Sequence, residues 1–195
     1  MEHVNRTLAE LSGEAKDLAF RRPLEQKARD HLIRLHVFED YDQISAWYTE
    51  DITMVLGLDT TLDGEILKGR AEIEDHFAAL HRQTSIEMVP FLVVADRGRI
   101  TCFTETFYKW LGGKREDGKA EDPEDLEEAP FVGWPMVSHG DVLKLREVIV
   151  FDLDEKMMVK RVECRQLSME QLGKVGLDTC ARESEKLAAL FYGDI

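Results

Sequence analysis

The first part of the chain has apolar residues spaced three and four apart, which is the pattern of amphipathic helices. One such stripe runs over residues 4–19, and a second begins after Pro23, which suits the first turn of a helix. A short helix is predicted after Asp40 and a longer one over 70–83. The tail beyond Ser168 returns to the same spacing. The pattern therefore predicts helices near both ends of the chain.

The middle of the chain is rich in apolar, β-branched and aromatic residues, much of it with the period of two that is typical of strands. Long segments of this kind cover 86–96, 99–110, 142–153 and 157–167, and a shorter one begins at Thr53. Helices followed by several long strands predict an α+β fold, with helices on one face of an antiparallel sheet.

We divide the chain into one central domain and two extensions. Residues 1–22 form an N-terminal helical extension, 23–167 the domain, and 168–195 a C-terminal helical extension. An acidic insertion over 112–141 separates two of the strands, and its composition predicts an exposed loop. We expect its apolar end around Trp134 to dock as a flap.

Composition and charge exclude several classes of partner. The 195 residues include 25 basic and 39 acidic side chains, which gives a formal net charge of −14. Phosphate backbones and anionic membrane surfaces repel such a charge, so neither nucleic acid nor a membrane is a predicted partner. No apolar run approaches the roughly 20 residues that span a bilayer. Three scattered cysteines without CxxC spacing fit the reducing cytoplasm.

Three segments within residues 24–167 resemble the nuclear transport factor two-like superfamily. They are FEDYDQISAWYTEDITMVL, ILKGRAEIEDHFAAL and REVIVFDLDEKMMVKRVECRQL, in this order. The resemblance implies a curved sheet wrapped around the helices, forming a cone with a pocket at its open end. The last segment is most similar to the closing hairpin of the SnoaL-like polyketide cyclases, in the branch that also includes ketosteroid isomerase. Many members of this superfamily are dimers.

The resemblance places the acid/base carboxylate of SnoaL-like cyclases at or beside Glu163. A second pattern points to the same region, since the last three strands each carry a central glutamate: Glu105, Glu147 and Glu163. With a three-residue turn, Glu147 faces Glu163 across the hairpin, and two close carboxylates form an acid and a base. With a two-residue turn, Glu147 faces Cys164 and the pair does not form. The glutamates also fit an outer polar face neutralised by arginines.

Further candidates lie on the helices and among the aromatic residues. His36 is on the apolar side of its helix and suits acid/base chemistry near neutral pH. Tyr48 is a candidate hydroxyl donor to a developing enolate. Both also fit ordinary core positions. The aromatic candidates for an apolar pocket, which fit a core equally well, are Trp47, Phe77, Phe91, Tyr108, Trp110 and Trp134.

Two functions stay open at this point. The first is a cofactor-independent cyclase, isomerase or dehydratase that removes a proton next to the carbonyl of an apolar small molecule, with Glu163 as the principal base. The second is a non-catalytic ligand-binding or assembly module of the same fold. No metal or nucleotide motif is present, so no cofactor is predicted. Either function predicts a homodimer, because the amphipathic N-terminal helix and a broad sheet need covering.

Overall fold

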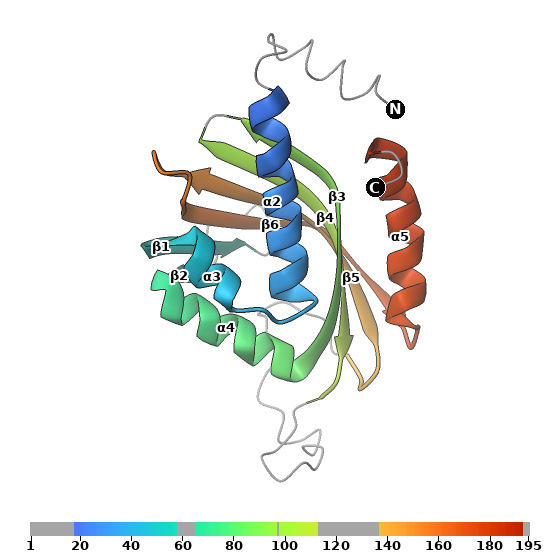
Figure 1. Ribbon diagram of the computed structural model, residues 1–195. Helices are drawn as coiled ribbons and strands as arrows, with labels where there is room; N and C mark the ends of the chain where they lie inside the picture. The colour runs from blue at the N-terminus through green and yellow to red at the C-terminus, as the bar shows by residue number, and fades with distance from the viewer. Residues whose placement is uncertain (1–17, 58–64, 97, 113–136, 193–195) are drawn as a thin grey trace.

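The computed structural model describes residues 18–57, 65–96, 98–112 and 137–192. Its elements in chain order (Figure 1) are α2 (Leu18–His36), α3 (Asp42–Trp47), β1 (Tyr48–Gly57), β2 (Glu65–Lys68), α4 (Gly69–Gln83), β3 (Thr84–Asp96), β4 (Arg99–Trp110), β5 (Val142–Leu153), β6 (Val159–Gly173) and α5 (Leu177–Tyr192). The strands form a six-stranded curved sheet in the order β2-β1-β6-β5-β4-β3. The predicted α+β fold, with a curved sheet around N-terminal helices, is confirmed.

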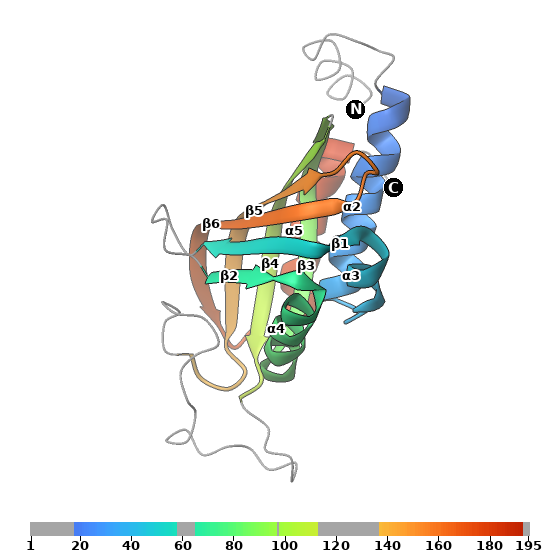
Figure 2. The same cartoon turned by 90° about the vertical axis from the view of Figure 1, so that its left-hand side faces the viewer.

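The sheet is mixed rather than wholly antiparallel. Strand β1 lies between β2 and β6 (Figure 2) and runs parallel to β6, with Val55 opposite Glu163. The other neighbouring strands are antiparallel. The β5–β6 hairpin leaves one edge of β6 open, and the distant β1 fills that edge in the parallel direction. The expected antiparallel sheet therefore contains one parallel pair.

We call the side of the sheet that α2 covers the inner face and the opposite side the outer face. Leu24, Ala28 and Leu32 of α2 are buried in the core that lies on the inner face. Pro23 lies inside α2 rather than in a first turn, so the predicted boundary at residue 22 falls within a helix. Packing of the apolar stripe offsets the backbone hydrogen bond that proline removes.

Alternation along β5 decides which of its side chains reach the inner face. Leu143, Leu145, Ile149 and Phe151 are buried in the core. Because side chains at every second position of a strand share one face, Glu147 points to the inner face with them. Its carboxylate therefore lies on the same side of the sheet as α2.

The turn between β5 and β6 is longer than either turn considered from the sequence. Strand pairing ends at Leu153 opposite Val159. The Asp154 Oδ1 atom accepts hydrogen bonds from the backbone N–H groups of Lys156 and Met158, each at 2.8 Å. These two bonds stabilise the wider turn.

The longer turn changes every pairing along the hairpin. Glu147 lies opposite Gln166, and Glu163 lies opposite Val150. The predicted pairing of Glu147 with Glu163 is therefore wrong, and so is the alternative in which Glu147 faces Cys164. The two carboxylates point to opposite faces of the sheet.

Helix α5 covers part of the outer face, so α2 and α5 lie on opposite sides of the sheet (Figure 1). Ser184 of α5 donates a hydrogen bond to Glu105 Oε2. Glu105 Oε1 lies 2.8 Å from Arg146 Nε and 3.0 Å from Lys144 Nζ. Burial would raise the pKa of Glu105, but the bonds from Ser184, Arg146 and Lys144 outweigh it and lower the pKa. This ionised carboxylate ties the predicted C-terminal helix to the domain.

Strand β6 continues to Gly173, so the predicted domain boundary at residue 167 falls within a strand. Most of the predicted N-terminal extension lies outside the described residues, as does most of the acidic insertion 112–141, Trp134 included. Within the described ranges, no helix has the length and apolar character needed to cross a membrane.

Candidate functional site

Glu147 interrupts the apolar row that β5 presents to the inner face. Thr106 of β4 donates a hydrogen bond from Oγ1 to Glu147 Oε2 at 2.7 Å. Burial raises the pKa of Glu147, and the bond from Thr106 opposes part of that rise. Desolvation thus moves this carboxyl toward the pKa range in which a group serves as both acid and base.

Tyr108 belongs to the same cluster. Thr106 also hydrogen-bonds Tyr108, so one hydroxyl connects the phenol with the carboxylate. Burial raises the pKa of Tyr108 well above 10, and the charge of Glu147 raises it further. Tyr108 is therefore a neutral phenol that is able to donate a hydrogen bond next to an acid/base carboxyl.

Two polar side chains flank Glu147 on the neighbouring strands. Thr104 of β4 and Gln166 of β6 each lie directly opposite Glu147. Thr104 Oγ1 and Gln166 Oε1 are buried and have no hydrogen-bond partner among the described residues. We call Thr104, Glu147 and Gln166 the inner polar row.

Tyr48 is buried at the start of β1, and its hydroxyl oxygen lies 2.9 Å from His31 Nε2. Burial raises the pKa of Tyr48 well above 10, and nearby Cys164 and Cys102 raise it further. For His31, burial lowers the pKa to about 3, with repulsion from Lys27 as a smaller cause. The Tyr48 hydroxyl is thus bonded to His31, whereas Tyr108 shares Thr106 with Glu147 and is the candidate donor nearer to that carboxylate.

His36 is buried against α4 and not beside Glu147. Its ring packs edge-on against Phe77, with centroids 4.9 Å apart, and lies 6.3 Å from the ring of His81. Burial, followed by repulsion from the other imidazoles, lowers the pKa of His36 to about 3. His36 therefore packs with the α4 side chains Phe77 and His81, which fits the core position that the sequence left open.

Trp47 and Phe77, two of the predicted ligand contacts, are buried members of the core. The Trp47 Nε1 atom donates to the backbone oxygen of Met157 at 3.0 Å, and its ring lies 5.5 Å from that of Phe151. These contacts hold Trp47 beside the β5–β6 turn. Both residues fit the core role that the sequence left open.

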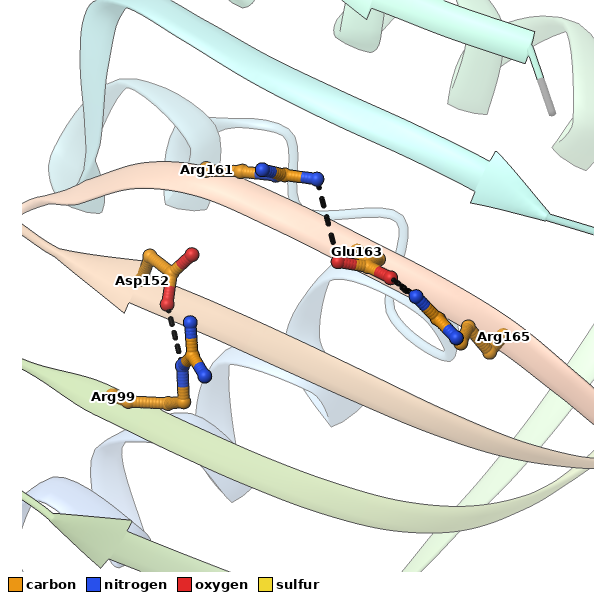
Figure 3. Close-up of polar contacts among 5 residues, drawn as sticks. All are labelled: Arg99, Asp152, Arg161, Glu163 and Arg165. Atoms are coloured by element: carbon orange, nitrogen blue, oxygen red, sulfur yellow. Dashed lines mark hydrogen bonds and ion pairs between the residues drawn. The ribbon is translucent and has the colours of Figure 1, made fainter. Parts of the chain in front are cut away.

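Glu163 lies on the outer face (Figure 3). Its carboxylate contacts Arg165, and Arg161 lies 3.4 Å from its Oε2 atom. Val162 beside it is buried in the core, so alternation turns Glu163 away from the inner face. Of the two readings that the sequence left open for Glu163, the outer polar face neutralised by arginines describes its position.

The structure does not bring the predicted aromatic residues into one lining. Tyr108 and Trp110 share the inner face of β4. Phe91 lies at a bulge in β3, and its ring centroid is 6.2 Å from that of Phe103. Phe103 alternates with the inner-face residues of β4, so this pair belongs to the outer face. Trp134 is outside the described residues.

Neither thiols nor metal ligands form a second reactive centre among the described residues. Cys102, Cys164 and Cys180 are free thiols. Burial raises the pKa of Cys102 to about 12 and raises that of Cys164 as well, so neither is an activated nucleophile. No group of three or more His, Cys, Asp or Glu side chains in the described ranges is placed to hold a metal ion.

Structures of known proteins share this arrangement of strands and helices. A Xanthomonas campestris pv. campestris protein provisionally classed as a polyketide cyclase matches with a TM-score of 0.52 at 15% identity, over 81% of this chain and 96% of its own. The present chain therefore has the nuclear transport factor two-like fold. This confirms the fold that the resemblance in the sequence implied.

Two enzymes of known activity have the same nuclear transport factor two-like fold. The Delta 5-3-ketosteroid isomerase from a Mycobacterium species matches with a TM-score of 0.50 at 12% identity, over 75% of this chain and 97% of its own. SalBIII, an epoxide hydrolase/cyclase-like enzyme in pyran ring formation in salinomycin, matches with a TM-score of 0.50 at 14% identity, over 74% and 91%. No family model and no curated protein matches the sequence. At these identities the likeness establishes the fold alone.

Sequence reasoning missed Thr104, Thr106 and Gln166. The signal was present in the strand pattern RITCFTETFYKW, where alternate positions place Cys102, Thr104 and Thr106 on one face. Gln166 required the register of the hairpin, which the sequence left open. The inner polar row can therefore be recognised only once the register of β4, β5 and β6 is known.

Proposed function

We propose that this protein binds an apolar carbonyl compound against the inner face and transfers a proton at the carbon next to the carbonyl. The observation that carries the proposal is the half-buried Glu147 carboxyl, hydrogen-bonded at 2.7 Å by Thr106 and set among buried apolar side chains of the inner face. The shared fold with a ketosteroid isomerase supports the same class of reaction without fixing it.

In this proposal Glu147 replaces Glu163 as the base. The ionised carboxylate takes the proton from carbon, and its protonated form returns a proton at a second carbon or assists the loss of water. Tyr108 donates a hydrogen bond to the oxygen of the developing enolate, where negative charge accumulates. Apolar side chains around the pair keep the carboxyl desolvated and its pKa raised.

The test is hydrogen–deuterium exchange at the carbon next to the carbonyl of 2-tetralone, a flat apolar ketone, followed by NMR in D₂O. We expect the protein to accelerate this exchange and Glu147→Gln to reduce the acceleration by about 100- to 10,000-fold. Glu163→Gln is the matched control and should keep the wild-type rate, because its carboxylate lies on the outer face. Equal rates in wild type and Glu147→Gln would exclude Glu147 as the base.

The Glu147→Gln variant should remain folded. The amide keeps an oxygen that accepts the bond from Thr106. Because burial raises the folded-state pKa of Glu147, ionisation of this carboxyl weakens the folded state as pH rises. Removal of the charge should therefore leave the variant at least as stable as the wild type at pH 8, so a lost rate reports on chemistry.

We further propose that the protein forms a homodimer through the outer face, in the reducing cytoplasm to which its free thiols are suited. One row of this face crosses four strands in the order Arg161, Asp152, Arg99 and Asp96, and Asp96 at the edge of the sheet also lies 3.6 Å from Arg21 of α2. Its charges alternate, and Arg99 Nε lies 2.7 Å from Asp152 Oδ1 (Figure 3).

Such a row is complementary to itself. A two-fold axis parallel to the strands, between β4 and β5, reverses the row and sets each arginine opposite an aspartate of the second copy. Arg161 then faces Asp96 of the partner subunit, and Arg99 faces Asp152 of the partner subunit. The same surface would serve a non-catalytic assembly module, the second function considered from the sequence.

The dimer is tested by light scattering after gel filtration. Arg161→Asp and Asp96→Arg should each weaken self-association by about tenfold or more, because both place like charges opposite one another. An equimolar mixture of the two variants should restore the dimer, since each changed residue then faces its opposite charge. A monomeric wild type, or two variants that associate as the wild type does, would contradict the proposed interface.

A further inference from the structure

Two buried side-chain oxygen atoms of the inner polar row have no hydrogen-bond partner among the described residues. Thr104 is 0% exposed and its Oγ1 has no described partner. Gln166 Oε1 is also buried, and no described residue bonds it. An unsatisfied buried polar atom costs free energy, and native proteins keep one chiefly where a ligand, ion or water completes it.

The two oxygen atoms belong to residues that lie on either side of Glu147. Thr104 and Gln166 lie on the strands on either side of Glu147, each directly opposite it. Directly opposite side chains on one face of a sheet are close neighbours. Both unexplained oxygens therefore border the carboxyl group to which the proposed reaction is assigned.

The donors and acceptors of the inner polar row determine which kind of group would complete its hydrogen bonds. An amide oxygen and an ionised carboxylate only accept hydrogen bonds, and a threonine hydroxyl both donates and accepts. Gln166 and Glu147 thus present acceptors side by side, and Thr106 supplies a donor to the carboxylate alone. The group that completes the row must carry an O–H or N–H hydrogen.

We propose that the ligand of the inner face carries a hydroxyl group, which donates to Gln166 Oε1 and accepts from the Thr104 hydroxyl. This inference rests on the proposed function and deepens it. The ligand class becomes a hydroxylated apolar compound rather than an apolar ketone in general. Thr104 and Gln166 are then specificity-determining contacts, whereas Glu147 and Tyr108 serve the reacting carbon and oxygen.

The test compares two probes that differ in the hydroxyl hydrogen: 2-naphthol and its methyl ether, 2-methoxynaphthalene. Binding is followed by the fluorescence of each naphthalene, with phenol and anisole as a smaller pair measured by ligand-observed NMR. We expect the wild type to bind the hydroxyl compound about 10- to 100-fold more tightly than the ether. Gln166→Leu and Thr104→Val should each reduce that preference at least threefold while binding of the ether is kept.

Thr101→Val is the matched control, because Thr101 lies on the outer face of the same strand. It should keep the full preference for 2-naphthol. Equal binding of both members of each pair would overturn the hydroxyl inference without contradicting the proposed ligand-binding function. No binding of either pair would overturn both. A preference that survives in Gln166→Leu and in Thr104→Val would show that the hydroxyl binds elsewhere.

Discussion

His31 and His36 together should lower the free energy of unfolding by about 4 kcal/mol between pH 7 and pH 5, because these buried histidines take up protons only when the protein unfolds. His31 and His36 each have a pKa lowered by burial to about 3. An unfolded histidine has a pKa near 6.5, so the unfolded chain binds more protons in the window between 6.5 and 3. Stability is therefore lost as the pH falls through that window, by about 1.4 kcal/mol per unit for each histidine.

Urea unfolding at pH 7, 6 and 5 measures this loss directly. His36→Phe should reduce the loss by about 2 kcal/mol, because the edge-on ring contact with Phe77 is kept while one titrating group is removed. His139→Gln is the control, since His139 is exposed, and it should retain the full loss. An unchanged dependence in His36→Phe would mean that His36 is not the group that resists protonation.

Glu105→Ala should lower the free energy of unfolding by about 3 kcal/mol, because it leaves partners of a buried carboxylate without their acceptor. The carboxylate is 6% exposed, and it binds Lys144, Arg146 and, across to α5, Ser184. Loss of these contacts should also release α5 from the outer face. Faster amide exchange in residues 177–192 would report that release independently of global stability.

Glu163→Ala is a well-matched control for Glu105→Ala. Both glutamates lie on the outer face with two basic partners, but the side chain of Glu163 is 23% exposed and none of its partners within the described ranges comes from a helix. An exposed ion pair contributes less than about 1 kcal/mol, so this variant should be nearly as stable as the wild type. Similar losses in the two variants would show that burial beneath α5 does not set the contribution of Glu105.

The pattern of β5 shows how much of the site was already present in the sequence. In VLKLREVIVFDL the residues Leu143, Leu145, Ile149 and Phe151 are spaced by two around Glu147. This spacing alone places Glu147 on the apolar face. The resemblance to SnoaL-like proteins favoured Glu163 instead, although Arg161 and Arg165 flank it at the same period.

The register of the β5–β6 hairpin was beyond sequence reasoning for a local reason. Asp154 accepts hydrogen bonds from two backbone N–H groups of the turn, and the turn is longer than the two or three residues considered from the sequence. One side chain therefore changes which residues face one another along two whole strands. The partner of Glu147 became Gln166, a residue that no motif singles out.

The parallel pairing of β1 with β6 was also unpredicted, and it has a consequence for biosynthesis. Strand β1 ends at Gly57 and its partner begins at Val159, so translation takes between about 5 and 20 s to supply the partner. During that interval β2 is the one described neighbour available to β1, and a two-stranded pair with an open edge is marginal by itself. Completion of the sheet therefore waits for the last strand to leave the ribosome, and the unfinished chain is the form that most needs a chaperone.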